Sequence, residues 1–325
     1  MKIAFYSTKP YDRIYFEPKS QEYDMQLHFY ETGCNEETIP LAKGHDVICI
    51  FVNDHLNENM IRQLKEMGIK AILLRCAGYN NVDVQAAHAC GIPVLRVPSY
   101  SPEAVAEFAA ALLLTVNRYT HRAYTRTRDF NMNINGFMGM DLYDKTAGVI
   151  GTGRIGQAMI RILKGFGMHI TAYDPYPVKG LDVEYDTLEN VFARADVLTL
   201  HCPLTSETKH IVQAKTIEMM KDGVYLVNTS RGDLIRTQDL IDGLLAKKFG
   251  GVGLDVYDEE GGVFYEDCSN DIMEDSNLAR LTTFPNVLVT SHMGFFTREA
   301  VEAIADVTLR NADAVRKQEK LDNAV

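Results

Sequence analysis

A glycine-rich turn and a later acidic residue are the first features of this sequence whose types and spacing could do chemistry. Gly151, Gly153 and Gly156 form a GxGxxG pattern between an apolar run and a helix-like segment. Glycines at this spacing permit a tight turn, close approach of a pyrophosphate and packing of a helix on a strand. Asp174 ends the next apolar run, about 20 residues on, where a carboxylate can bind a ribose diol. The pattern predicts a dinucleotide-binding site.

Asp174 also indicates which dinucleotide is bound. An acid here would repel the additional phosphate of NADP, and no arginine follows directly to receive that phosphate. We therefore expect NAD as the cofactor. The alternative is that Asp174 is a solvated turn residue before Pro175.

Arg231, Glu260 and His292 each follow an apolar, strand-like segment, and open α/β sheets bind ligands at the carboxyl edge. An arginine can bind a carboxylate through two parallel hydrogen bonds. A histidine can donate and accept a proton near neutral pH, and a glutamate in contact with it would favour its charged form. Each residue also has a purely structural alternative. Arg231 could bridge two loops, Glu260 could belong to a solvated acidic loop, and His292 could be a structural histidine at a strand end. Spacing alone leaves these alternatives open.

The elements that must position these residues alternate between strands and helices, which favours parallel sheets with helices on both faces. Strands are expected first at residues 2–6, 46–51, 71–74 and 94–97. A second series is expected at residues 147–150, 169–173, 197–201, 224–228, 251–256 and 287–291. Helices are expected at residues 57–67, 82–90, 157–166, 240–247 and 297–316.

One further helix is predicted to start at Ser101, as N-cap, with Pro102 in the first turn, and to run to about Arg122. Its middle, residues 104–116, is too apolar for a helix with one solvent-exposed face and too short to span a bilayer. The sequence therefore predicts that this helix is buried between domains or in a subunit interface.

The chain length of 325 residues favours two domains, because a single hydrophobic core usually stops growing below that size. The last helix could pack back on the first domain and make it discontinuous. We therefore expect an α/β protein of two Rossmann-like domains with parallel sheets and a cleft between them. A flavodoxin-like substrate domain would comprise residues 1–100 and 299–325, and an NAD-binding Rossmann domain would comprise residues 101–298.

Composition excludes several classes of function. The net charge is −11 with scattered Lys and Arg, so no nucleic acid or anionic membrane is expected as a partner. No signal peptide and no membrane-spanning run is present, which predicts a cytoplasmic protein. The six cysteines form no CxxC pair, so we expect reduced thiols and no metal site.

Three long blocks of the sequence resemble the D-isomer-specific 2-hydroxyacid dehydrogenases, and most closely their D-lactate dehydrogenase branch. The blocks are the glycine pattern, residues 191–211 and residues 220–236, in that order, and the resemblance extends over essentially the full chain. It implies hydride transfer between NAD and C2 of a small 2-oxo or 2-hydroxy acid, with pyruvate and D-lactate as the expected pair. It also implies a homodimer with the helix after Pro102 in the interface.

The resemblance further implies roles for individual residues. Arg231 would bind and polarise the substrate, His292 would donate a proton to the carbonyl oxygen, and Glu260 would be the charge partner of His292. The residues implied at the substrate are Cys76, Ala77, Gly78, Tyr79, Tyr100 and Phe295. The residues implied at the cofactor, besides the three glycines, are Arg154, Ile155, Asp174, Cys202, Pro203, Thr208, Thr229, Ser230 and Asp255. Asp255 would also influence the pKa of the titratable groups in the site.

The chain departs from the family pattern at three places. Ser291 and Gly261 stand where the family commonly has proline, and Arg236 stands where an acid is common. None of these changes removes a catalytic group, so they bear on loop geometry and substrate preference. Two alternatives remain, a dehydrogenase for larger 2-oxo acids and an NAD(H)-sensing corepressor on the same fold. The bulky pair Phe295 and Phe296 argues for a small apolar pocket.

Overall fold

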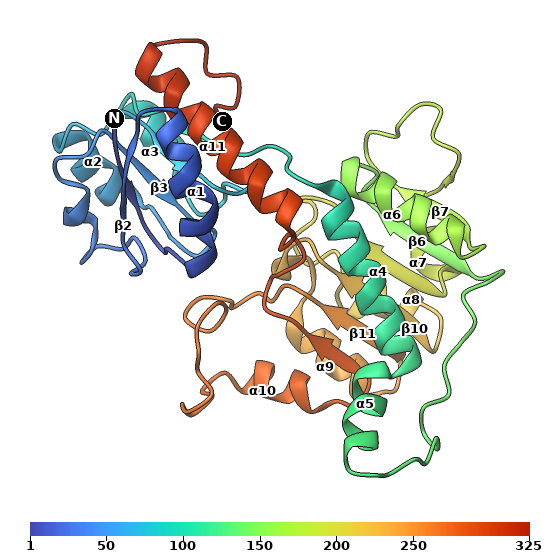
Figure 1. The fold of residues 1–325 in the computed structure, drawn as a ribbon. Coiled ribbons are helices and arrows are strands. Elements are labelled where there is room, and N and C mark those ends of the chain that lie inside the picture. The colour runs from blue at the N-terminus through green and yellow to red at the C-terminus, as the bar shows by residue number, and fades with distance from the viewer. The chain divides into compact units, whose positions relative to one another are not determined.

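The computed structural model describes residues 1–325, and the chain divides into two compact units (Figure 1). Unit 1 comprises Met1–Ser101 and Phe296–Val325, and unit 2 comprises Pro102–Phe295. Each unit contains its own all-parallel sheet. The prediction of an α/β fold with two parallel sheets is therefore confirmed. No helix is long and apolar enough to cross a membrane.

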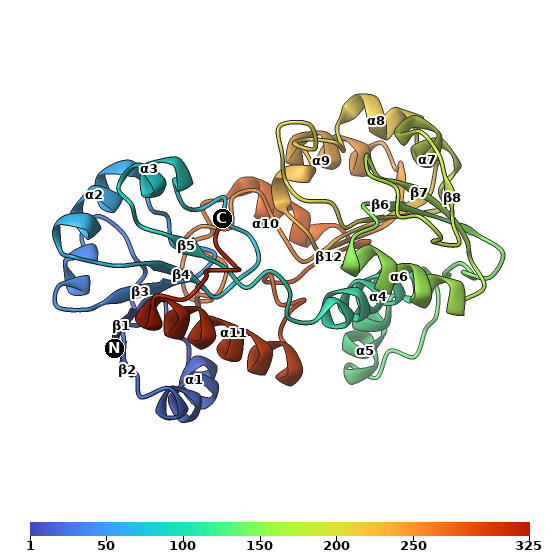
Figure 2. The same ribbon diagram turned by 90° about the horizontal axis from the view of Figure 1, so that it is seen from above.

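Unit 1 is a five-stranded sheet with helices on both faces. Its strands are β1 (Lys2–Phe5), β2 (Gln26–Phe29), β3 (Val47–Ile50), β4 (Ile72–Leu74) and β5 (Val94–Leu95), in the spatial order β2-β1-β3-β4-β5. Its helices are α1 (Pro10–Glu22), the short 3₁₀ helix η1 (Ile39–Ala42), α2 (Glu58–Glu66), α3 (Val84–Ala89) and α11 (Arg298–Lys317). Figure 2 shows α2 and α3 on one face of the sheet and α1 and α11 on the other.

Burial of apolar side chains and capping of helix ends stabilise the strands and helices that were expected in unit 1. All four residues of β3 are buried, as in a central parallel strand. The Asn57 side chain accepts a hydrogen bond from the Met60 N–H and so caps α2. Thr297 caps α11 in the same way, through the N–H of Ala300.

Within unit 1 the sequence analysis missed α1, β2 and the 3₁₀ helix η1. Helix α1 buries only Asp12, Phe16 and Ser20 and contains Pro18. It therefore lacks the continuous apolar stripe from which a helix is predicted. Strand β2 lies at the sheet edge and has no fully buried residue. Both elements depend on their contacts with the rest of unit 1 more than on local pattern.

The other edge of the unit 1 sheet, at β5, is covered by the segment that follows α11. Ala324 pairs with Leu95 in an antiparallel bridge, and the Val325 N–H donates to the Val94 carbonyl at 3.0 Å. These bonds satisfy backbone groups that an edge strand would otherwise leave open.

Unit 2 is a seven-stranded sheet with helices on both faces. Its strands are β6 (Thr146–Ile150), β7 (His169–Tyr173), β8 (Glu184–Tyr185), β9 (Val197–Leu200), β10 (Val224–Asn228), β11 (Phe249–Leu254) and β12 (Val287–Val289). Their spatial order is β12-β11-β10-β9-β6-β7-β8. Its helices are α4 (Pro102–Arg118), α5 (Thr120–Arg128), α6 (Arg154–Gly165), α7 (Leu188–Arg194), α8 (Ala214–Met219), the 3₁₀ helix η2 (Gly232–Leu234), α9 (Thr237–Leu245) and α10 (Ser276–Thr283). Figure 2 shows α4 and α6 on one face and α7, α8 and α9 on the other.

The apolar helix α4 is shorter than predicted. It ends at Arg118, because Tyr119 adopts a left-handed conformation with φ 52° before α5 begins. Its apolar residues are buried against the sheet of its own unit, in one cluster with residues of β6, β9 and β10. Gly253 on β11 has no side chain, and a Cβ there would lie 3.0 Å from Leu112, so α4 approaches the strand closely. Packing on this sheet accounts for the burial of its apolar middle.

Candidate active site

The chemistry-bearing residues of unit 2 follow strands that are parallel neighbours in one sheet. The glycine pattern follows β6, Arg231 follows β10, Asp255 follows β11 and His292 follows β12. The carboxyl ends of parallel strands meet at one edge of a sheet, where α/β proteins bind ligands. The topology therefore brings these residues to a common edge.

The three glycines have the geometry that a dinucleotide site needs. Gly151 has φ +93°, and a Cβ there would lie 2.7 Å from the backbone of His201 and Cys202. A Cβ on Gly156 would lie 2.1 Å from the Gly151 carbonyl oxygen, so this glycine lets α6 pack on the loop. Gly153 caps α6 and has no atom within 4 Å of its Cβ position, which leaves room for a phosphate at the helix N-terminus. Arg154 and Ile155 begin that helix.

Asp174 is held against the glycine loop. Its Oδ2 atom accepts from the Thr152 N–H at 2.7 Å and from the Thr152 hydroxyl at 3.0 Å, and Oδ1 accepts from the Tyr176 N–H at 2.9 Å. The carboxylate therefore connects the end of β7 to the turn after β6. It is partly buried beside the glycine loop, where a dinucleotide ribose would lie.

Thr229 offers the clearest sign that a ligand belongs here. Its hydroxyl is buried and has no hydrogen-bond partner in the protein. Next to it, the Ser230 hydroxyl donates to the Cys202 carbonyl at 2.6 Å, and the Thr208 hydroxyl donates to the Pro203 carbonyl at 2.6 Å. Burial raises the pKa of the Cys202 thiol to about 11, so this cysteine is not a reactive thiolate. Together with the glycine loop, these residues fit NAD.

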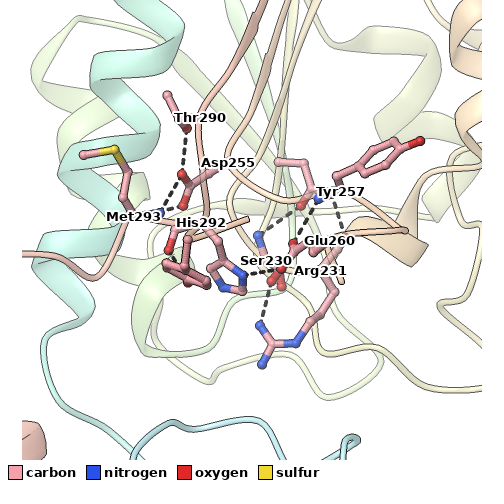
Figure 3. Close-up of polar contacts among 11 residues, drawn as sticks. Ser230, Arg231, Asp255, Tyr257, Glu260, Thr290, His292 and Met293 are labelled. Atoms are coloured by element: carbon pink, nitrogen blue, oxygen red, sulfur yellow. Dashed lines mark hydrogen bonds and ion pairs between the residues drawn. The ribbon is translucent and has the colours of Figure 1, made fainter. Parts of the chain in front are cut away.

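His292 and Glu260 are in direct contact, which the sequence could not establish. The His292 Nδ1 atom lies 2.8 Å from Glu260 Oε2, and both side chains are largely buried (Figure 3). The other carboxylate oxygen, Oε1, accepts from the Tyr257 N–H at 3.0 Å. An ionised carboxylate only accepts hydrogen bonds, so Nδ1 carries a proton and Nε2 is left to exchange one with a substrate.

Asp255 organises the backbone around His292. Its carboxylate accepts from the Thr290 hydroxyl at 2.6 Å and from the N–H groups of Met293 and Gly294 at 2.9 and 2.7 Å (Figure 3). Its carbonyl accepts from the His292 N–H at 2.7 Å. Burial raises the pKa of the Asp255 carboxyl above its usual value, although the three donors oppose that effect. Both oxygens of this carboxylate are thus occupied by the protein.

Arg231 starts the 3₁₀ turn after β10. Its carbonyl accepts from the Asn228 side chain at 2.8 Å, and its Nη1 atom donates to the Ser230 carbonyl at 2.7 Å. Figure 3 shows its guanidinium extending past the Glu260–His292 pair toward the same side as the imidazole. Its remaining N–H groups can receive a carboxylate.

The candidate substrate loop of unit 1 is held by Arg96. The Arg96 guanidinium donates to the Ala77 carbonyl at 2.9 Å and lies over the Tyr79 ring at 5.3 Å. The Cys76 thiol donates to the Gly78 carbonyl at 3.2 Å, and the Cys76 carbonyl accepts from the Val97 N–H. Tyr100 lies near the end of the first chain segment of unit 1, and Phe295 is the last residue of unit 2.

Sequence reasoning missed several residues that shape the site. Tyr265 donates its hydroxyl to the His292 carbonyl at 2.8 Å, and Thr290 bonds to Asp255. Tyr185 donates to the Thr152 hydroxyl at 2.9 Å and so supports the glycine loop. No local pattern distinguishes these hydroxyls from any other loop or strand hydroxyl. No group of three or more His, Cys, Asp or Glu side chains is placed to hold a metal ion.

Comparisons with known proteins agree with this geometry. The family model for the NAD-binding domain of D-isomer-specific 2-hydroxyacid dehydrogenases matches residues 110–294. The D-lactate dehydrogenase of Escherichia coli K12 is 48% identical to this chain over 326 residues, which cover 99% of each protein.

Two solved structures extend the agreement to three dimensions. The apo structure of D-lactate dehydrogenase from Escherichia coli superposes with a TM-score of 0.90 at 45% identity and covers 100% of both chains. The pyruvate reductase of Chlamydomonas reinhardtii superposes with a TM-score of 0.92 at 38% identity, over 99% of this chain and 98% of that one. The chain therefore belongs to the D-isomer-specific 2-hydroxyacid dehydrogenases and is an NAD-dependent oxidoreductase.

Proposed function

We propose that this protein is a D-lactate dehydrogenase that reduces pyruvate to D-lactate. The observation that carries the proposal is the 2.8 Å contact between His292 and Glu260, at the sheet edge that also carries Arg231 and the NAD loop. These are the parts that reduction of a 2-oxo acid needs, namely a proton donor, a carboxylate-binding cation and a hydride carrier.

Bound NADH supplies the hydride that adds to C2 of the substrate. Glu260 stabilises the charged form of His292 by accepting a hydrogen bond from its Nδ1–H group, and the Nε2 proton passes to the carbonyl oxygen. Arg231 binds the substrate carboxylate and stabilises the negative charge that develops on the oxygen. In the oxidation of D-lactate the same groups act in reverse, with neutral His292 as the base.

We propose that unit 2 binds NAD and carries the catalytic groups, and that unit 1 contributes further contacts to the substrate. We propose that the N–H groups of the loop Cys76–Tyr79 contribute to binding the substrate carboxylate and that Tyr100 lines the site. Phe295 would form the wall beside the substrate side chain. Its bulk supports a small substrate over a branched 2-oxo acid, and an apolar wall does not favour a phosphate group.

We also propose that the protein is a cytoplasmic homodimer. Its six cysteines form no disulfide, as is typical of a reducing compartment. The segment from α5 to β6 runs along unit 2 without helix or strand (Figure 1) and exposes large apolar side chains. These are Phe130, Met132, Ile134 and Met138, each at least 67% exposed. Such a concentration of apolar surface is typical of an interface, and a second copy of the chain is the occupant we propose. Light scattering with size-exclusion chromatography would give twice the chain mass.

The test of the proposed activity is oxidation of NADH, followed by absorbance, with pyruvate, 2-oxobutyrate, 2-oxoisocaproate, phenylpyruvate and hydroxypyruvate. We expect the highest kcat/KM with pyruvate and a product that a D-specific lactate assay detects. Preference for a bulky acid would retain the mechanism and refute the role of Phe295. Absence of turnover with all five acids would refute the proposed function.

A further inference from the structure

His292 adopts a left-handed backbone conformation. Its φ is +53°, in the left-handed region that residues with a Cβ rarely adopt. Such a conformation costs about 1–2 kcal/mol and persists only where neighbouring groups hold it. The backbone conformation decides where the imidazole points, so the contacts that hold it bear directly on the Glu260–His292 geometry.

The His292 N–H donates to the Asp255 carbonyl at 2.7 Å, and two further contacts lie on the peptide group between His292 and Met293. Its N–H donates to the Asp255 carboxylate at 2.9 Å, and its carbonyl accepts from the Tyr265 hydroxyl at 2.8 Å. The peptide plane is therefore bonded on both of its sides. Asp255 holds the N–H of this peptide group, and the Tyr265 hydroxyl holds its carbonyl. Without the hydroxyl, only the bond to Asp255 would oppose rotation about the His292 Cα–C bond.

Tyr265 comes from the same turn as Glu260. The Glu260 carbonyl accepts from the N–H groups of Val263 and Phe264 at 3.2 and 3.0 Å, and Tyr265 follows directly with φ +68°. The Tyr265 ring lies 6.3 Å from the imidazole, tilted by 30°. One short segment thus carries both the carboxylate that binds the imidazole and the hydroxyl that binds its backbone.

We propose that Tyr265 is a positioning residue for the proton donor. Its hydroxyl fixes the peptide after His292 and so keeps the imidazole against Glu260, with Nε2 free for the substrate. This inference rests on the proposed function for its effect on catalysis, but the positioning itself is a property of the free protein. A purely structural tyrosine would contribute through its ring, and its hydroxyl would be dispensable.

The test variant is Tyr265→Phe, which keeps the ring and removes only the hydroxyl. Loss of this hydrogen bond should lower kcat for pyruvate roughly 3- to 10-fold, the range expected for one net hydrogen bond. The Kd for NADH should stay at its wild-type value. The alkaline limb of the pH profile of kcat/KM should move to lower pH, because the imidazolium spends less time beside Glu260. Tyr225→Phe is the matched control, since Tyr225 is a buried tyrosine of β10.

A second measurement does not depend on turnover. In ¹⁵N-histidine-labelled protein, the His292 side-chain signals are identified by their loss in His292→Gln and followed through a pH titration. Tyr265→Phe should move the midpoint of that titration to lower pH, and Tyr225→Phe should not. Unchanged kinetics and an unchanged titration in Tyr265→Phe would overturn the inference. A shifted titration in a protein that reduces no 2-oxo acid would support the positioning role and refute the proposed function instead.

Discussion

His292 makes three separate contacts, one from its backbone N–H, one from its carbonyl and one from its imidazole. The N–H binds the Asp255 carbonyl, the carbonyl binds Tyr265 and Nδ1 binds Glu260. Together these contacts restrict the backbone and the side-chain torsions of His292. The Nε2 atom therefore has a defined direction before a substrate binds. Placement of this kind reduces the reorganisation needed during the reaction.

Replacement of the imidazole tests its role as proton donor. We expect His292→Gln to lower turnover of pyruvate by about 100-fold or more, the usual scale for a lost general acid. The amide can still bind Glu260 but cannot deliver a proton. Fluorescence titration should show nearly unchanged NADH binding, because the glycine loop and Asp174 are untouched. A variant with wild-type turnover would remove His292 from the mechanism.

Arg231→Lys tests the carboxylate-binding role of the guanidinium. A lysine retains the charge but cannot form two parallel hydrogen bonds, so KM for pyruvate should rise and kcat should fall. Steady-state kinetics with saturating NADH separates the two effects. Arg236→Lys is the control, since Arg236 is an exposed arginine of the same segment, 4.0 Å from Asp239. Equal behaviour of the two variants would contradict the role of Arg231.

At the scale of elements, unit 1 depends on an ion pair between the end of β4 and the first turn of α1. The Arg75 and Asp12 side chains are 1% and 2% exposed and lie 3.5 Å apart. The guanidinium also lies between the rings of Phe5 and Phe51, at 4.5 and 4.6 Å, and donates to the Ser7 carbonyl at 2.7 Å. This pair holds α1, which has little apolar surface of its own, and stands directly before the Cys76–Tyr79 loop.

Asp12→Asn should therefore destabilise the protein strongly. The change leaves the Arg75 charge buried without its counter-ion, which typically costs about 3–5 kcal/mol. Glu58→Gln removes one partner of the exposed Glu58–Arg62 pair on α2 and should cost less than about 1 kcal/mol. Urea unfolding of both variants measures the difference. Similar losses in the two variants would mean that the buried pair is not a main support of α1.

At the scale of the whole molecule, stability toward acid depends on groups that bind protons differently in the folded and unfolded states. Burial lowers the pKa of His201, beside the glycine loop, to about 4. Its Nδ1 atom has no partner, and Nε2 lies 2.8 Å from the Thr199 hydroxyl. The unfolded chain, with a histidine pKa near 6.5, therefore takes up this proton first as the pH falls. The stability that neutral His201 contributes is present above about pH 6.5 and is lost between about pH 6.5 and 4.

His201→Gln should remove this part of the pH dependence. Between about pH 7 and pH 5 the wild type should lose roughly 2 kcal/mol more stability than the variant. Asp12 and Asp255, whose pKa values are raised by burial, act in the opposite direction but are present in both proteins. Urea unfolding at several pH values, without cofactor, gives the comparison. Parallel stability curves would show that His201 is not the group responsible.

The sequence predicted the central strands and the helices α2, α3, α4, α6, α9 and α11 because their signals are local. In unit 2 it missed the two-residue strand β8 and the short helices α5, α7, α8 and α10. Buried strands such as β3 and β10 are short apolar runs, and the caps at Asn57 and Thr297 lie beside the helices that they start. Predicted strand ends were less accurate, as for β12, which ends at Val289. Helix α1 was missed because it is stabilised by contacts with distant residues, Arg75 among them.

By itself the sequence determined the chemistry that the protein contains. The glycine spacing, Asp174 and the residues that follow β10, β11 and β12 indicate an NAD site and the candidate catalytic groups. Only the tertiary structure decided which of these groups meet. Glu260 and His292 are 32 residues apart in the chain, and their contact depends on how the loops after β11 and β12 fold around Asp255. The left-handed His292 and its bond to Tyr265 arise from the same non-local packing, which no pattern of neighbouring residues encodes.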